Sequence, residues 1–189
     1  MCYNAKVYVS LCARGGQNMI ILGIDPGYAI VGWGVIRFER GRFLPLDFGA
    51  ILTDADTPFS KRLQEIHTQL STILARHTPD AVSVEKLYFQ NNQKTAIAVA
   101  EARGVILLAL EQAGVPVFEY TPLQVKSAVT GYGQAHKPQV MEMTKRLLRL
   151  KEVPKPDDTA DALAMAICHA QYGGATVKNT LLTMKGNGK

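Results

Sequence analysis

The sequence MIILGIDPG, residues 19–27, opens with an uninterrupted apolar run and closes on Asp25-Pro26-Gly27. A strand with one exposed face alternates apolar and polar residues, whereas a continuous run of this length is typical of a strand buried on both faces. The Asp-Pro-Gly sequence that follows favours a turn. The sequence therefore predicts a central strand that ends at Asp25.

Two further strands and a helix are predicted directly after this turn. The segments 30–38 and 43–53 are rich in β-branched and aromatic residues and are separated by the turn 39–42, which predicts an antiparallel meander. Apolar residues then recur at helical spacing from Phe59 to Leu74, and Thr78-Pro79-Asp80 ends this helix. A short buried strand, 81–84, runs into Glu85.

The segment 95–113 has the length and composition of a helix, but its apolar residues surround it instead of forming one stripe. Such a helix needs cover on two sides. The sheet would cover one side, and either a second subunit or a neighbouring helix of the same chain would cover the other.

The remaining elements complete an α/β fold. We expect a strand at 115–120, helices at 122–130, 138–150 and 159–172, and a glycine-rich loop at 131–137. A meander followed by two crossover connections predicts a mixed five-stranded sheet with helices on both faces. The expected organisation is an N-terminal extension (1–18), one folded domain (19–174) and a basic, frayed C-terminal tail (175–189).

Charge and cysteine content limit the classes of function. The chain carries 21 Lys and Arg against 16 Asp and Glu, and residues 121–189 hold ten basic and five acidic side chains, so the whole surplus lies there. A basic region of this kind suits an anionic partner such as nucleic acid, or is simply a solvated surface. The three cysteines form no CxxC pair, which favours a reducing cytoplasm, and no apolar run is long enough for a membrane span.

Four carboxylates stand where the ends of strands and the start of a helix would gather a site. Asp25 and Glu85 each end a predicted strand, and Asp158 and Asp161 share one face near the start of the last helix. Oxygen ligands of this type suit hard cations such as Mg²⁺ or Mn²⁺. Three of them also have a structural reading: Asp25 as a turn residue, Glu85 as the first exposed residue after a strand, and Asp158 as a helix-starting residue.

The ordered blocks ILGIDPG, GWGVI, VEKLYFQNN, EARGV, PVFEYTPLQVK and DDTADALAMAICH resemble the RuvC family of Holliday-junction resolvases. The resemblance covers residues 19–169 and implies an RNase H-like, three-layer fold. It implies a homodimeric, Mg²⁺-dependent endonuclease with Asp25, Glu85, Asp158 and Asp161 as ligands. Two departures are the extension before Met19 and the adjacent Asp157-Asp158 pair, of which Asp158 preserves the family spacing.

The activity implied by the resemblance is paired, symmetric nicking of a four-way junction in recombination and repair. Two Mg²⁺ ions per subunit, which Mn²⁺ can replace, would activate water and stabilise the leaving oxygen, giving a 5′-phosphate and a 3′-hydroxyl. Lys126 and Lys137 match basic positions near DNA phosphates, and Tyr88 matches an aromatic position that stacks on a junction base. The sequence leaves open whether the RuvA–RuvB branch-migration complex binds.

The same residues allow other interpretations. His136 and His169 are read as exposed and as structural, respectively. An ATP-binding domain of the actin type shares an Ile-Asp-x-Gly strand-turn, but it needs a second phosphate loop that the chain lacks. A nuclease for RNA–DNA hybrids would keep the fold and change the substrate. A non-catalytic junction-binding protein would have no use for four carboxylates facing phosphates.

Overall fold

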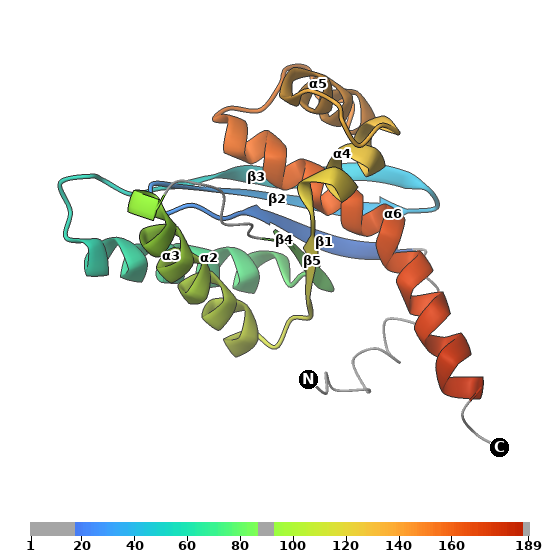
Figure 1. Ribbon diagram of the computed structural model, residues 1–189, viewed down its shortest axis with the longest axis horizontal. Helices are drawn as coiled ribbons and strands as arrows, with labels where there is room; N and C mark the ends of the chain where they lie inside the picture. The colour runs from blue at the N-terminus through green and yellow to red at the C-terminus, as the bar shows by residue number, and fades with distance from the viewer. Residues whose placement is uncertain (1–17, 87–92, 187–189) are drawn as a thin grey trace.

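The computed structural model describes residues 18–86 and 93–186, with side chains described for 18–86 and 95–173. Its centre is one mixed sheet of five strands in the order β3-β2-β1-β4-β5 (Figure 1). The strands are β1 (Asn18–Asp25), β2 (Ile30–Glu39), β3 (Arg42–Leu52), β4 (Ala81–Glu85) and β5 (Val117–Tyr120). The meander β1-β2-β3 is antiparallel, and β4 and β5 run parallel to β1. The central position predicted for the first strand is confirmed.

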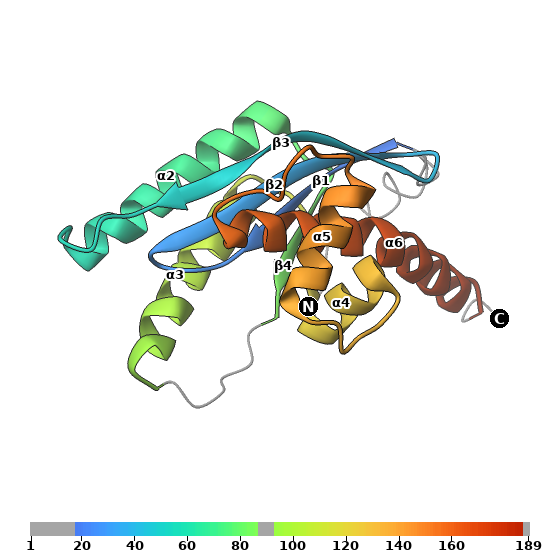
Figure 2. The same cartoon turned by 90° about the horizontal axis from the view of Figure 1, so that it is seen from above.

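Helices cover both faces of the sheet, as predicted. One face carries α2 (Phe59–His77) and α3 (Gln93–Gln112), and the other carries α4 (Pro122–Thr130), α5 (Lys137–Leu147) and α6 (Asp157–Gly186) (Figures 1 and 2). Each layer of helices forms a separate apolar core with the face of the sheet that it covers. Leu22, Ile24 and Ile66 lie in the core under α2 and α3, whereas Ile21 and Leu163 lie in the core under α6. Alternate residues of β1 thus serve the two cores, which explains why that strand is apolar throughout.

The last helix is longer than the sequence suggested. The prediction was a helix over 159–172 followed by a frayed tail, but α6 runs from Asp157 to Gly186. The Gly173-Gly174 pair directly follows the predicted end of the helix. Glycine lowers helix propensity by about 1 kcal/mol but keeps its backbone donor, so a helix can continue through it. A side chain at Gly173 would also lie 2.9 Å from the His169 ring, one turn earlier, so a side chain larger than glycine would collide with that ring.

On the sheet side, the contact with α6 is made by the backbone of glycines. A Cβ atom on Gly23 would lie 1.9 Å from the carbonyl oxygen of Ala162, and one on Gly34 would lie 2.5 Å from the Leu163 side chain. Both distances are too short for any side chain larger than glycine. The helix therefore rests directly on β1 and β2, and its position along the sheet is fixed by this contact.

Candidate active site

Two carboxylates lie side by side at the carboxyl edge of the sheet. In the parallel pairing of β1 with β4, Ile24 is opposite Val84, and Asp25 and Glu85 are the next residues of their strands. Both side chains are partly buried. The strand register alone therefore brings together the two acidic residues that the sequence placed at strand ends.

The first turn of α6 adds the other two carboxylates to this edge. Gly32 of β2 is paired with Asp25, and a Cβ atom on Gly32 would lie 2.0 Å from the carbonyl oxygen of Asp158. The buried Thr159 hydroxyl donates to the carbonyl oxygen of Gly49 in β3 at 3.1 Å and fixes the same turn. Asp158 and Asp161 therefore start from a turn that lies against β2, beside Asp25.

The electrostatics of Asp25 show that the four carboxylates share one region. Burial is the largest cause of a rise in the pKa of Asp25 to about 8, and the charges of Asp161, Glu85 and Asp158 raise it further. The pKa of Glu85 is also raised, first by burial and then by Asp161. A region that disfavours carboxylate charge to this degree is suited to a cation.

Lys137, the first residue of α5, supplies a positive charge to this region. Its Nζ lies 2.9 Å from Oδ2 of Asp161 and lowers the pKa of both Asp25 and Glu85. The hydrogen bond to Asp161 is the largest cause of the raised pKa of Lys137 itself. Sequence reasoning placed Lys137 near DNA phosphates and did not foresee that it would contact a predicted metal ligand.

The adjacent residues Asp157 and Asp158 have different surroundings. Asp157 lies 2.7 Å from the Lys155 ammonium and 3.9 Å from that of Lys137, and the hydrogen bond from Lys155 lowers its pKa. Asp158 instead raises the pKa of Asp25. The charge of Asp158 therefore acts on the shared region, whereas Asp157 is bonded to Lys155.

The donor chemistry at this edge fits a divalent cation. All four side chains are carboxylates, the ligand type that Mg²⁺ and Mn²⁺ favour. Across the described residues, no group of three His, Cys, Asp or Glu side chains is arranged so that it could hold a metal ion by itself. Mg²⁺ is commonly held by one or two carboxylates together with water and substrate phosphates, so an open arrangement of this kind suits it.

The remaining predicted site residues lie in several places. Lys126 is partly buried on α4, on the same face of the sheet as α5 and α6, and Tyr88 lies outside the described residues. His136 immediately precedes α5, where its backbone N–H donates to Gln139 Oε1 at 3.0 Å. His169 is buried, its Nδ1 lies 2.8 Å from the Tyr120 hydroxyl, and burial lowers its pKa to about 4. These contacts agree with a structural role for His169.

Comparison with known proteins shows to which family the chain belongs. The pattern of the family described as "Crossover junction endodeoxyribonuclease RuvC" matches residues 21–169. The relative of that name from Brevibacillus brevis is 59% identical over 154 residues, which cover 82% of this chain and 93% of the relative. The one from Clostridioides difficile is 55% identical over 152 residues, covering 80% and 90%.

Solved structures of RuvC proteins resemble the fold of this chain. The Thermus thermophilus RuvC structure is 38% identical with a TM-score of 0.78, over 84% of this chain and 98% of that one. The same protein in complex with a Holliday junction substrate gives a TM-score of 0.80 over 84% and 97%. The yeast mitochondrial Holliday junction resolvase, at 14% identity and a TM-score of 0.63, shares the fold.

These comparisons define the protein as a nuclease of α/β fold. The chain belongs to the RuvC family of crossover junction endodeoxyribonucleases. Membership implies a nuclease that depends on a divalent metal, which agrees with the carboxylate chemistry of the edge. Among the residues the structure describes, no helix is long and apolar enough to cross a membrane.

Proposed function

We propose that the protein is a structure-specific endonuclease that resolves four-way DNA junctions by paired, symmetric nicks in recombination and repair. The observation that carries this proposal is the convergence of four carboxylates on one edge of the sheet, in a chain of this family. A relative at 38% identity has been solved with a Holliday junction substrate, which supports the choice of DNA substrate.

Asp25, Glu85, Asp158 and Asp161 would hold Mg²⁺, two ions per subunit, with Mn²⁺ able to replace it. When bound, these ions would supply an activated water and charge stabilisation for an in-line displacement that leaves a 5′-phosphate and a 3′-hydroxyl. The protein prepares the site by its own electrostatics. Asp25 holds a proton over much of the neutral range in the metal-free protein, because its pKa is about 8, and it must release that proton to become a ligand.

Lys137 would contact the substrate backbone beside the carboxylates. Its side chain is 52% exposed while it contacts Asp161, so the ammonium can also reach a phosphate brought to this edge. Lys126 would add a second phosphate contact from α4, and Tyr88 would stack on a base at the crossover. Contacts to phosphate position the junction without reading its sequence, whereas stacking stabilises an opened base.

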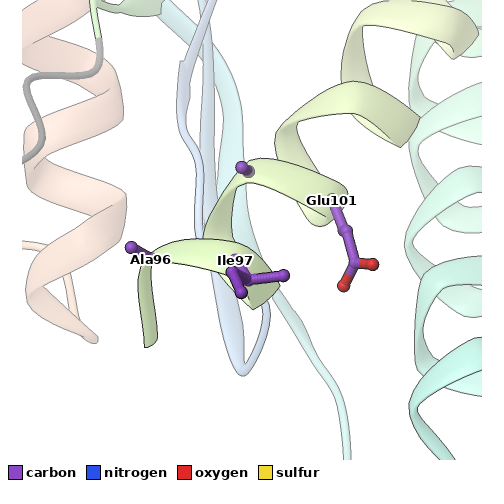
Figure 3. A pocket seen from close by; sticks show the side chains of 4 residues that line it. Ala96, Ile97 and Glu101 are labelled. Atoms are coloured by element: carbon purple, nitrogen blue, oxygen red, sulfur yellow. The ribbon is translucent and has the colours of Figure 1, made fainter. Parts of the chain in front are cut away.

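A homodimer would supply the second, symmetric cut. On α3, Ile97 is 69% exposed and Leu108 is 52% exposed, although α2 and the sheet cover the opposite side of this helix. Ala96, Ile97, Ala100 and Glu101 line a shallow hollow on the exposed side (Figure 3). An exposed apolar surface of this kind suits a second copy of the chain. The RuvA–RuvB branch-migration complex is a candidate partner of the dimer.

A nicking assay tests this function. Labelled immobile four-way junctions, linear duplex and RNA–DNA hybrid of the same sequence are incubated with wild type, Asp25→Asn and Asp157→Asn, in Mg²⁺ or in EDTA. We expect symmetric, Mg²⁺-dependent cuts confined to the junction, lost in Asp25→Asn and retained in Asp157→Asn. Equal cutting of the hybrid or the duplex would contradict the assignment of the four-way junction as the substrate. Tight junction binding without cutting would indicate a binding protein.

A further inference from the structure

A buried guanidinium lies behind the turn that follows Asp25. Arg62 of α2 is 7% exposed and occupies the same helical stripe as the core residues Ile66 and Leu70. Its Nε donates to the Thr53 hydroxyl oxygen at 2.9 Å, and Nη2 donates to the Tyr28 carbonyl oxygen at 3.2 Å. The guanidinium carbon also lies 5.1 Å from the centre of the Tyr28 ring, a cation–π distance.

Ordinary core packing does not account for this residue. A buried charge is costly unless an opposite charge and hydrogen bonds compensate it, and within the described residues Arg62 forms no ion pair with a carboxylate. An apolar side chain would fill the stripe at lower cost. Among the residues that the structure describes, the polar contacts of the Arg62 side chain go to Tyr28 and Thr53, and these residues flank the turn after Asp25.

The contacts form a connected network. The Thr53 hydroxyl accepts from Arg62 and donates to the Tyr28 carbonyl oxygen at 2.7 Å, while the Thr53 backbone N–H donates to the Ala29 carbonyl oxygen at 3.0 Å. The turn is compact, since a Cβ atom on Gly27 would lie 2.2 Å from the Ile30 carbonyl oxygen. Strand pairing fixes the turn at Asp25, and this network fixes it at residues 28 and 29.

We propose that Arg62 is a positioning residue that, through Thr53 and Tyr28, holds the turn after Asp25 and so sets the direction of the Asp25 carboxylate. Arg62 does not touch the reacting groups. Residues that orient metal ligands in this way typically change metal affinity or activity by about 10- to 100-fold when they are replaced. This inference rests on the proposed role of Asp25 as a metal ligand.

The test uses two replacements in the network, each with a matched control. Arg62→Met removes the guanidinium and keeps an apolar side chain of similar length, and Lys61→Met makes the same replacement at the exposed neighbouring position. Thr53→Val removes the bridging hydroxyl with little change of volume, and Thr53→Ser keeps it. Thr53→Val also serves as the independent test if Arg62→Met fails to fold.

Three quantities are measured at least 15 °C below the melting temperature of each variant. They are the single-turnover cutting rate at saturating junction, the junction Kd in EDTA, and Mn²⁺ affinity by electron paramagnetic resonance titration without DNA. For Thr53→Val and Arg62→Met we expect the cutting rate and the Mn²⁺ affinity each to fall about tenfold or more, with the junction Kd changed less than about twofold. Thr53→Ser and Lys61→Met should stay close to wild type.

Two results would overturn the inference: unchanged Mn²⁺ affinity and cutting rate in Thr53→Val, or a loss of cutting matched by an equal loss of junction binding. Failure of the proposed function is distinct from both. It would appear as wild type that does not cut junctions, or that cuts them in EDTA. In that case the Mn²⁺ titration still decides whether Arg62 and Thr53 act on Asp25.

Discussion

Replacement of Asp25 by asparagine should stabilise the metal-free protein, and more so as the pH rises. An aspartate has an ordinary pKa of 3.8, and burial with three nearby carboxylates raises that of Asp25 to about 8. Below pH 3.8 both the folded and the unfolded protein hold the proton, so Asp25 costs no stability. Between the two values only the unfolded state ionises, and the free energy of unfolding falls until the pH passes about 8.

The size of this effect follows from the shift in pKa. One pKa unit corresponds to about 1.4 kcal/mol, so Asp25 lowers the free energy of unfolding by about 5 kcal/mol at pH 8 and by about 1.5 kcal/mol at pH 5. Asparagine has nearly the same shape and carries no charge. In a chain of this size 1 kcal/mol shifts the melting temperature by about 2–4 °C. We therefore expect Asp25→Asn to melt about 10–20 °C above wild type at pH 8 and about 3–6 °C above it at pH 5.

The assay is thermal unfolding in EDTA at several values of pH from 5 to 8, with Asp157→Asn as the control. Asp157 has a lowered pKa because it is bonded to Lys155, so its removal should give no stabilisation at any pH. Addition of Mg²⁺ should raise the melting temperature of wild type more than that of Asp25→Asn. A difference between Asp25→Asn and wild type that does not grow with pH would refute the electrostatic account of the site.

Three more predictions concern the same edge. Asp158→Asn should abolish junction cutting in Mg²⁺ while Asp157→Asn retains it, and the reverse result in a nicking assay would exchange their roles. Lys137→Ala should weaken junction binding and reduce the slope of log Kd against log salt by about one; an unchanged slope would remove Lys137 from the phosphate contacts. Gly32→Ala should lower the cutting rate by about 100-fold, because its Cβ would lie 2.0 Å from the Asp158 carbonyl oxygen and displace that turn; a wild-type rate would show that the turn adapts.

Much of the fold could be predicted because its signals are local. The apolar run at 19–24, the meander and the stripe of α2 each specify their own element, and the predicted elements overlap the observed ones. The end of α6 could not be predicted, because the glycine pair at 173–174 is compatible with both a helix stop and the close approach of a side chain such as His169. Only the tertiary contact decides between these two meanings.

The candidate site was predicted to different degrees for different residues. The four carboxylates could be proposed from the sequence because strand ends and helix starts converge at one edge. The contact of Lys137 with Asp161 could not, since it depends on how the loop 131–136 sets α5 against α6. Arg62 was missed although the signal was present: an arginine at position 62 of a stripe otherwise formed by Ile66, Leu70 and Leu74 is a polar residue in a core position. Such a residue marks a buried hydrogen-bond network.

The glycines of β1 and β2 explain why the core and the site cannot be separated in this protein. Gly23 and Gly34 let α6 rest on the sheet, and Gly32 continues the same contact to the turn that carries Asp158. Packed cores resist displacement because their packing density is as high as that of organic crystals. The distance from Asp158 and Asp161 to Asp25 is therefore set by the packing of α6 on β1 and β2, and a core replacement under α6 should move two of the four carboxylates together.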